Sequence, residues 1–424
     1  MTSSVGALPP THMAVRWRIA LLLCLITTIN YVDRIAFSVA TPTLRDRFGF
    51  TNADIGDFGL AFLAAYALGQ LFGGRIVDRF GVKRTYGFAV MAWSLACIAH
   101  ALGQGVRSFS LARVALGLGE AVNFPAAFKA VAEWFPRVER SLAVGVVTLG
   151  VGFGSMITPP LAGWLIITLG WQWAFIVPGT LGLLWLVLWQ RAYHAPEAHP
   201  RLGGAERELI IAERDQAPGA PRPVLALLSL PETWVLIARR FVADGAFYFL
   251  LFFLASYLID ERGFVLRDIA LFAWLPFAFA DLGSFAGGWV STRLMRRGWS
   301  LARARTLTMW VGAVLAVAAL PAAYADSAWL CFALICATLF AIQFKQANLF
   351  TLPSDLFPAR DVATVWGMFG AAGSVGGALF SAFSGRLADA VGFAPVFVIV
   401  AILHIVSAGI AMLAIRKLVR VRQV

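Results

Sequence analysis

Residues 17–41 read WRIALLLCLITTINYVDRIAFSVAT, an apolar stretch long enough to cross a bilayer as a single helix. Comparable apolar stretches recur along the whole chain. Of the 424 residues, 60% are hydrophobic and 14% are charged, whereas a soluble protein carries about 25% charged residues. The sequence therefore predicts an integral membrane protein.

The apolar stretches predict an all-α membrane protein with twelve transmembrane helices. A long, proline-rich polar segment separates the sixth stretch from the seventh and is expected to be mostly irregular. We predict an N-terminal six-helix bundle (1–191), a cytoplasmic central loop (192–231) with a short surface helix at 205–215, and a C-terminal six-helix bundle (232–424). The expected helices span residues 17–41, 55–79, 85–102, 109–135, 140–169, 171–191, 232–259, 267–294, 301–324, 328–356, 362–390 and 395–418.

The net charge of +12 could indicate a nucleic-acid partner, but the placement of the basic residues argues against one. Arginine and lysine gather in alternate short loops and at the C-terminus, as at residues 79–84, 293–305 and 416–422, while the intervening loops have few. This positive-inside pattern predicts that both termini are cytoplasmic. Residues 1–16 show no cleavable signal pattern, so the first apolar stretch is expected to remain as a helix.

Short motifs repeat between the two halves of the chain. A Gly-Gly pair at 73–74 recurs 214 residues later at 287–288, and Phe-Pro at 135–136 recurs at 357–358. Parallel repeats of this kind place a substrate site near the middle of the membrane, between the halves. The expected fold is therefore two pseudo-symmetric six-helix bundles with a site between them.

Four charged residues lie inside two of the apolar stretches. Asp33 and Arg34 fall in the first stretch, and Arg113 and Glu120 fall in the fourth. Each charge at the bilayer centre costs about 2.5–3.5 kcal/mol on insertion scales, so such residues are rare and usually functional. A static network of charges between helices is the structural alternative. We interpret the quartet as the site of a proton-linked carrier for a small anion.

The spacing of the quartet suggests how it works. Arg113 and Glu120 are seven residues apart, so they share a helix face, about 10.5 Å apart along the axis. Asp33 and Glu120 lie at similar depths, which predicts cross-pairing of Asp33 with Arg113 and of Glu120 with Arg34. Arg34 is expected to bind the substrate carboxylate, because a guanidinium matches a carboxylate with two hydrogen bonds. Glu120, with Asp33 as the second candidate, is expected to carry the coupled proton, since an anion that draws Arg34 away favours protonation of Glu120.

The strongest motif lies after the second expected helix and reads Gly74-Arg-Ile-Val-Asp78-Arg79-Phe-Gly81-Val-Lys-Arg84. It resembles the cytoplasmic loop signature of the major facilitator superfamily, in which this cluster is taken to stabilise the outward-facing state. On physical grounds, Gly74 permits close approach of helices, and Asp78 can pair with basic groups or with a helix N-terminus. The resemblance implies a conformational role for Gly74, Asp78, Arg79, Gly81 and Arg84.

Further segments narrow this resemblance. Residues 30–34 and 113–125 resemble the anion:cation symporter branch, which carries sugar acids and other organic anions. In the second half, residues 262–264, 274–284 and 346–355 resemble the hexuronate (glucuronate and galacturonate) transporters. The resemblance covers nearly the whole chain and implies an importer of a sugar acid with protons, by alternating access, in the inner membrane of a bacterium. We expect a monomer to be functional, although the sequence leaves the oligomeric state open. Glucuronate, galacturonate, aldonates, aldarates and aromatic acids all stay open as substrates, as does the proton stoichiometry.

Polar residues within the tenth expected helix are candidates for the other side of the site. Lys345 lies in mid-helix, far from both ends, where a charged side chain is costly. We predict that it contacts the substrate anion together with its neighbours Gln346 and Asn348. The alternative for Lys345 is a lysine that snorkels or is paired within its own bundle.

Three hydroxyl-bearing residues, Tyr31, Tyr66 and Ser374, also fall within expected helices. Contact with sugar hydroxyl groups and ordinary packing fit each of them equally well, and we include all three among the predicted substrate contacts. Asp244 and Asp281 lie within expected helices too, but the sequence indicates a partner for neither.

The sequence carries no sign of an enzyme. It has no GxxxxGK[ST] loop, no nucleophile triad and no cluster of metal ligands, and its four cysteines form no CxxC pair. We therefore expect no cofactor, no metal and no ATP drive. The expected partners are a small organic anion, protons and the lipid bilayer. Two rival functions stay open, an organic-anion exporter or antiporter and a non-transporting membrane sensor built on the same fold.

Overall fold

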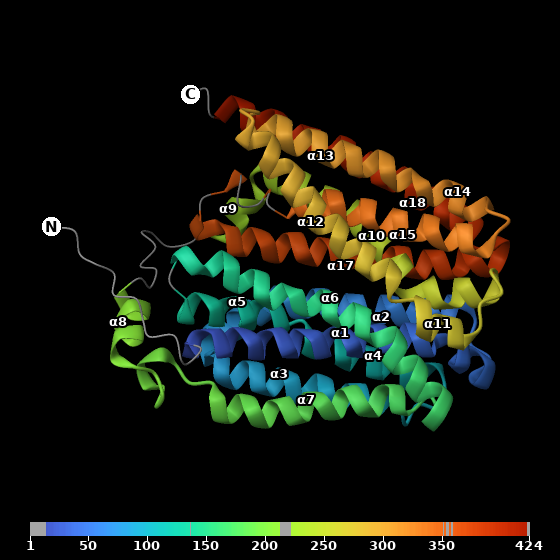
Figure 1. Cartoon of the computed structure of the whole chain (residues 1–424), viewed down its shortest axis with the longest axis horizontal. Coiled ribbons are helices and arrows are strands. Elements are labelled where there is room, and N and C mark those ends of the chain that lie inside the picture. The colour runs from blue at the N-terminus through green and yellow to red at the C-terminus, as the bar shows by residue number, and fades with distance from the viewer. Residues whose placement is uncertain are drawn as a thin grey trace.

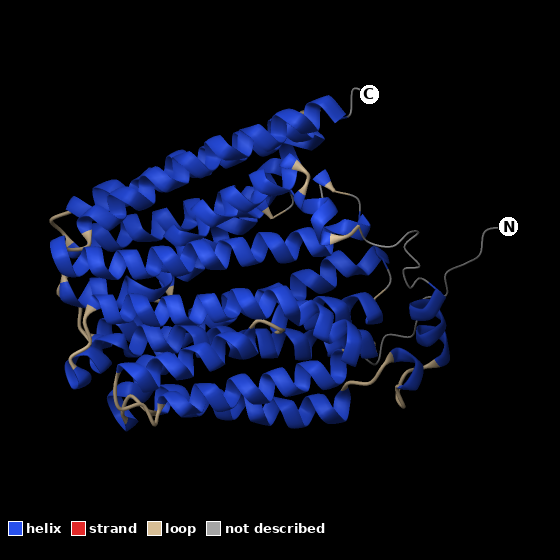
Figure 2. Cartoon of the chain, turned by 180° about the vertical axis from the view of Figure 1, so that it is seen from behind, coloured by secondary structure: helices blue, strands red, loops and turns tan. Residues whose placement is uncertain are grey.

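The computed structural model describes residues 14–135, 137–212, 222–350, 352, 356–357 and 359–421. These residues form helices joined by short turns (Figure 2). The long helices run side by side, with the first-half helices below and the second-half helices above in Figure 1. We call the end where α1 begins and α8 lies the α8 side, and the opposite end the far side.

The helices of the first half are α1 (Val15–Phe48), α2 (Asn52–Phe80), α3 (Val82–His100), α4 (Val106–Glu120), α5 (Asn123–Trp134), α6 (Arg137–Leu169) and α7 (Trp173–Ala192). The connecting segment contains η1 (Pro196–Ala198), α8 (Gly204–Ala212) and α9 (Val224–Leu228). The helices of the second half are α10 (Pro231–Asp260), α11 (Leu266–Phe272), α12 (Leu275–Arg296), α13 (Leu301–Leu315), η2 (Ala316–Ala318), α14 (Ala319–Tyr324), α15 (Ala328–Leu349), α17 (Ala359–Val391) and α18 (Ala394–Val421).

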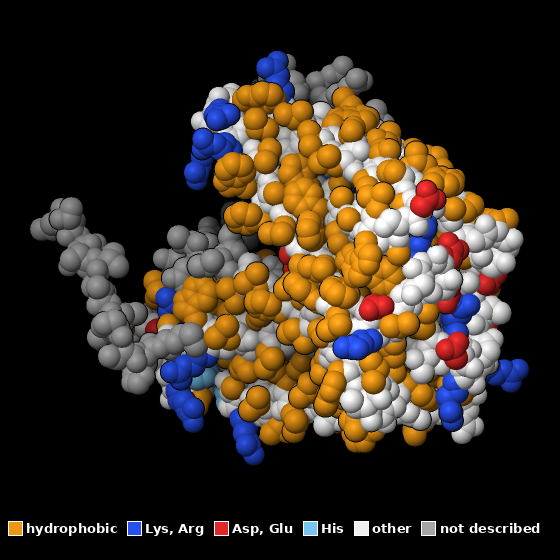
Figure 3. Space-filling model, turned by 45° about the vertical axis from the view of Figure 1, so that its right-hand side comes forward, with side chains coloured by type: hydrophobic (Ala, Val, Ile, Leu, Met, Phe, Trp, Pro, Cys, Tyr) orange, Lys and Arg blue, Asp and Glu red, His pale blue; other side chains and the backbone are white. Residues whose placement is uncertain are grey.

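The helices have the length and surface of membrane spans. Within the described ranges, nine helical segments are long and apolar enough to cross a membrane. The other three expected spans correspond to α3, to α4 followed by α5, and to α18, whose stretch Ala394–Ile410 is shorter. Large hydrophobic side chains cover much of the outer surface (Figure 3), and Phe285 and Leu111, for example, are 74% and 71% exposed. The prediction of an all-helical, multi-pass membrane protein is confirmed.

Three of the expected helices are interrupted, each just ahead of a proline. α4 and α5 separate ahead of Pro125, α11 and α12 separate ahead of Pro276, and the 3-10 turn η2 lies ahead of Pro321. Proline lacks the N–H that would bond to the carbonyl four residues earlier, and its ring crowds that carbonyl. The single helices expected at 109–135, 267–294 and 301–324 are therefore wrong in this detail, and the first break leaves Glu120 at the end of α4.

The connecting segment is tied to the start of the first helix. The predicted surface helix is present as α8, although residues 213–221 lie outside the described part of the chain. Glu206 of α8 accepts hydrogen bonds from the backbone nitrogens of Val15 and Arg16, each at 3.3 Å, and pairs with the Arg16 guanidinium at 2.8 Å. An acidic group is stabilising at a helix N-terminus, so this contact holds α8 against α1.

Ion pairs join the two halves on the far side. Arg386 of α17 pairs with Asp57 of α2 at 2.7 Å, and Arg45 of α1 pairs with Asp260 of α10. Asp389 accepts hydrogen bonds from the first backbone nitrogens of α2, at 3.0 Å and 2.6 Å. These contacts close the far side of the molecule.

Corresponding helices of the two halves face each other across this interface. The hydroxyl of Ser38 on α1 donates to the carbonyl of Phe252 on α10 at 3.2 Å, and these residues are 214 positions apart, the same separation as the repeated glycine pairs. On the α8 side the helices of the two halves diverge (Figure 1), and the surface is hollowed between them (Figure 3). The molecule is therefore closed on the far side and open on the α8 side.

Candidate functional site

A buried ion pair joins α1 to α4. Nη2 of Arg34 lies 2.7 Å from Oε2 of Glu120, and Nε of Arg34 lies 3.1 Å from the same oxygen. The two side chains are only 2% and 0% exposed. The predicted pairing of Glu120 with Arg34 is confirmed.

Aromatic rings surround the Arg34 guanidinium. Its Cζ lies 5.0 Å from the ring centre of Tyr31, 5.1 Å from that of Phe62 and 4.7 Å from that of Tyr66. Aromatic faces attract a cation at this range, the more so where water is excluded. Tyr31 and Tyr66 therefore lie beside the group expected to bind the substrate carboxylate, where their hydroxyls can meet the same substrate.

Glycines allow α4 to place Glu120 at this depth. A Cβ added at Gly117 would strike the backbone of Phe62 on α2, and one added at Gly119 would lie 2.8 Å from the Cβ of Trp93 on α3. Only glycine permits such close approach of helix backbones. The α4 backbone is therefore seated between α2 and α3, next to the rings that surround Arg34.

The predicted pairing of Asp33 with Arg113 is wrong. Asp33 points toward α3, where Cys97 Sγ donates to its Oδ1 at 3.3 Å. Arg113 instead places its Cζ 4.7 Å from the ring centre of Phe37 and 4.3 Å from that of Phe62. The physical reason is that Asp33 and its neighbour Arg34 project about 100° apart on the helix. When Arg34 faces α4, Asp33 faces α3.

Arg113 is a buried cation without a hydrogen-bond partner among the described residues. Its side chain is 0% exposed. Besides the rings on α1 and α2, it lies 5.6 Å from the ring centre of Phe252 on α10. Arg113 therefore lies where the two halves meet, near the Arg34–Glu120 pair. The N–H groups of its guanidinium have no hydrogen-bond acceptor among the described residues.

A second ion pair lies in the other half of the molecule. Nε of Arg240 is 2.6 Å from Oδ2 of Asp244, one turn later on α10. Gln346 of α15 donates to Oδ1 of Asp244 at 3.0 Å. Arg240 also packs over Phe350 and Phe369, with its Cζ 4.7 Å and 5.0 Å from the ring centres. Gln346, which the sequence predicts as a substrate contact, positions the carboxylate of this pair in the structure.

The sequence-based reasoning missed Arg240. It noted Asp244 without a partner, although an arginine and an aspartate four residues apart lie on one helix face. That spacing, inside an apolar stretch, could have indicated the ion pair from the sequence. Gln346 and the aromatic partners of Arg240 come from other helices, so no sequence spacing indicates their contacts.

Gln70 of α2 connects the two ion-pair clusters. The hydroxyl of Ser374 on α17 lies 3.3 Å from Oε1 of Gln70 and also donates to the carbonyl of Gly370 at 3.1 Å. Gln70 is one helical turn from Tyr66. On the other side, Gly373, the neighbour of Ser374, lies directly against the Arg240–Asp244 pair. Ser374 therefore lies at the boundary of the halves, as its predicted role requires.

Two predicted substrate contacts lie inside the second half instead. Lys345 is 0% exposed and donates to the carbonyl of His404 on α18 at 3.4 Å. Asn348 donates to the carbonyl of Gly287 at 3.1 Å and accepts from Arg305 at 2.8 Å. Residues 345 and 346 project about 100° apart, so only Gln346 faces α10. In this structure both side chains take part in the packing of the second half, which is the alternative stated for Lys345.

Residues 23–381 match the family profile described as Major Facilitator Superfamily. The chain belongs to this superfamily. It is a membrane transporter and not an enzyme. The predicted superfamily and its fold are confirmed.

Several relatives of this chain are named as transporters of organic anions. The hexuronate transporter of Escherichia coli (strain K12) is 33% identical over 398 residues, which cover 93% of this chain and 92% of that protein. The D-galactonate transporter of Escherichia coli O6:H1 is 30% identical over 405 residues, which cover 93% and 94%. A solved bacterial homologue of the human lysosomal transporter Spinster, inward-facing and unoccupied, matches with a TM-score of 0.78 at 20% identity, over 97% of this chain and 99% of that chain. This last likeness concerns the fold alone.

The superfamily loop motif lies at the α8 side, between α2 and α3. Gly81 has a φ of +80°, a conformation that L side chains rarely adopt, and it joins the two helices. Arg79 and Arg84 are exposed, and the side chain of Asp78 lies outside the described part of the chain. Among the described residues, a Cβ at Gly74 would meet nothing within 4 Å, so no close approach to a described helix is made there. Gly69, whose Cβ would lie 2.5 Å from that of Ala121, makes the close approach of α2 to the α4–α5 break.

Asp281 of α12 lies where the second half contacts α6 of the first half. It is exposed on α12, and a Cβ added at Gly152 of α6 would touch its carboxylate. The sequence indicated no partner for Asp281, and the structure places it beside a helix of the opposite half.

Proposed function

We propose that this protein imports a hexuronate or a related sugar acid together with protons, by alternating access. The observation that carries the proposal is the buried Arg34–Glu120 pair, which joins α1 to α4 inside the first half. A guanidinium suited to a carboxylate is held by a carboxylate that can accept a proton. The hexuronate and D-galactonate transporters among the relatives support an anionic sugar as the substrate.

The pair provides a direct link between anion and proton. Without substrate, Glu120 is the counterion of Arg34. A substrate carboxylate that takes the Arg34 donors leaves Glu120 buried without its cation, and a buried unpaired carboxylate takes up a proton rather than remain charged. Asp33, which is held by a thiol and not by an arginine, is the candidate for a second proton. Arg113 adds positive charge that favours an anion between the halves.

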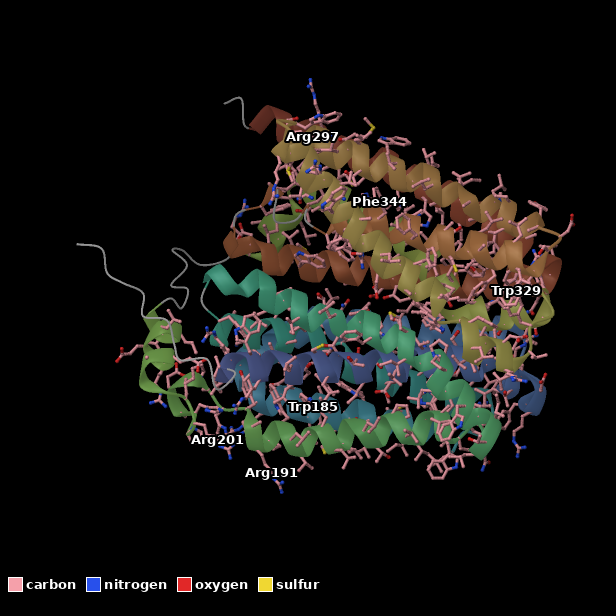
Figure 4. The ribbon with its side chains drawn as sticks, viewed as in Figure 1. Trp185, Arg191, Arg201, Arg297, Trp329 and Phe344 are labelled. Atoms are coloured by element: carbon pink, nitrogen blue, oxygen red, sulfur yellow. The ribbon has the colours of Figure 1, made fainter. Side chains whose placement is uncertain are left out.

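We infer that the α8 side is cytoplasmic. Arg191, Arg201 and Arg297 lie toward this side in Figure 4, whereas Trp329 lies toward the far side. Basic residues favour the cytoplasmic face, so the structure corresponds to an inward-open state. In that state the far-side ion pairs form the closed outer gate. All of these groups come from one chain, and we propose that a monomer is sufficient for transport.

Uptake into proteoliposomes tests the proposal. Purified protein is reconstituted, an inside-alkaline pH gradient is imposed, and entry of labelled glucuronate and galacturonate is followed. Accumulation that collapses with a protonophore supports proton-coupled import. Uptake that is unaffected by the protonophore contradicts the coupling. Binding of either sugar acid without any flux would favour the sensor alternative, and accumulation only when protons flow the other way would favour an antiporter.

A further inference from the structure

The Arg240–Asp244 pair has the same construction as the Arg34–Glu120 pair. Each consists of a guanidinium within 2.7 Å of a carboxylate, inside apolar helices, with aromatic rings packed on the guanidinium. One pair belongs to each half of the molecule. A single carboxylate on the substrate accounts for only one of them.

Arg240 is the more accessible of the two arginines. Its side chain is 14% exposed, against 2% for Arg34. Its contact with Asp244 uses Nε, while Nη1 is buried without a hydrogen-bond partner among the described residues. A buried donor without an acceptor is costly. This donor is therefore available to an anion that enters between the halves.

The neighbouring helix leaves room for this pair and connects it to the first site. A Cβ added at Gly373 of α17 would strike Asp244 and would lie 2.7 Å from Nε of Arg240. The next residue, Ser374, reaches Gln70 of α2. Gly373 and Ser374 thus link the Arg240–Asp244 pair to α2 of the first half, the helix that also carries Tyr66 and Phe62.

We propose that Arg240 binds a second carboxylate of the substrate, so that the transporter prefers dicarboxylic sugar acids to monocarboxylic ones. This inference rests on the proposed function, because it extends the same site. One end of the substrate binds Arg34 and displaces Glu120, and the other end binds Arg240 and displaces Asp244. The hydroxyls between the two ends face Tyr31, Tyr66 and Ser374.

Galactarate and galactonate form a matched pair of probes. They share the same arrangement of hydroxyls and differ only at carbon 6, which is a carboxylate in galactarate and a hydroxymethyl group in galactonate. Each is used to inhibit uptake of labelled galacturonate into proteoliposomes, and the measured quantity is the ratio of the two inhibition constants. A hydrogen-bonded charge contact predicts that galactarate binds about 10- to 100-fold more tightly to the wild-type protein.

Substitutions assign this preference to one side chain. Arg240→Gln is expected to bring the ratio close to one, and Arg240→Lys to retain part of it. Asp244→Asn is expected to raise the ratio, because it removes the counterion that competes with the substrate. Arg239→Gln is the matched control, since Arg239 has the same charge but donates to the carbonyl of Ser407 on α18 at 3.1 Å. This control is expected to keep the wild-type ratio.

Several outcomes would overturn the inference. A wild-type protein that takes up galacturonate but has a ratio near one contradicts it while leaving the proposed function intact. A high ratio that survives in Arg240→Gln, or that falls equally in Arg239→Gln, also contradicts it. If Arg240→Gln does not fold, a ratio in Asp244→Asn no higher than the wild-type value decides against the inference. A protein that neither binds nor transports any of these acids contradicts the proposed function itself.

Discussion

Replacement of Glu120 by glutamine tests the coupling step directly. Glutamine keeps the size of the side chain and an oxygen that can accept a hydrogen bond from Arg34, but it carries no charge for a proton to neutralise. Glu120 is 0% exposed and bonded to Arg34 through Nε and Nη2. We therefore expect Glu120→Gln to behave as a permanently protonated protein, which exchanges substrate across the membrane but does not accumulate it in response to a pH gradient.

The same change is expected to tighten anion binding at alkaline pH. In the wild-type protein, an incoming carboxylate displaces two charged hydrogen bonds, of 2.7 Å and 3.1 Å. A hydrogen bond to a charged group contributes about 1.5–3 kcal/mol and a neutral one about 0.5–1.5 kcal/mol. The competition is thus weaker by roughly 2–3 kcal/mol in the variant, which corresponds to about 30- to 150-fold tighter binding. At acidic pH, where Glu120 is protonated, the two proteins should converge.

Calorimetry at alkaline and acidic pH compares the binding of galacturonate by the variant and the wild-type protein. Uptake and counterflow in proteoliposomes compare their transport. Glu208→Gln is the control, because it neutralises an exposed acid on α8, away from both the Arg34–Glu120 pair and the far-side ion pairs. Glu120→Gln that still accumulates galacturonate under a pH gradient would refute the coupling role. Binding that keeps the wild-type pH dependence would refute the competition between Glu120 and the substrate.

Three further predictions concern packing, gating and the unpaired cation. Gly117→Ala should lower the free energy of unfolding by about 1–3 kcal/mol, because its Cβ overpacks the boundary between α4 and α2. Thermal melting followed by tryptophan fluorescence measures the loss of stability. Gly74→Ala is the control and should melt like the wild-type protein. Asp389→Ala should weaken far-side closure by about 1 kcal/mol, roughly fivefold, because the N-terminus of α2 loses its acidic partner. An impermeant thiol reagent should then label a Ser38→Cys reporter about fivefold faster. An unchanged labelling rate would contradict this prediction. Arg113→Met should raise the melting temperature while reducing transport, since it replaces a buried charge that has no hydrogen-bond partner among the described residues. A lower melting temperature would contradict this prediction and show that the arginine stabilises the fold.

The charge quartet illustrates how far sequence reasoning reaches. That Arg34 and Glu120 pair followed from their depth in two apolar stretches, and the structure has this contact. Depth alone could not separate Asp33 from Arg34, because adjacent residues share a depth and differ in direction. The direction depends on the rotation of α1 about its axis, which the packing of α1 against α3 and α4 sets. The same reasoning explains why Gln346 faces the second ion pair while Lys345 faces α18.

A multi-pass helical membrane protein of the major facilitator superfamily can be recognised from this amino-acid sequence alone. Apolar length, the placement of basic residues and the loop motif are local properties, so they can be recognised along one dimension. The pairing of the buried charges depends on how the helices pack, because partners such as Arg34 and Glu120 are 86 residues apart in the sequence. The tertiary structure also placed Arg240 in an ion pair with Asp244 in the second half. Contacts between helices depend on rotation and close approach, and these arise only when all the helices pack together.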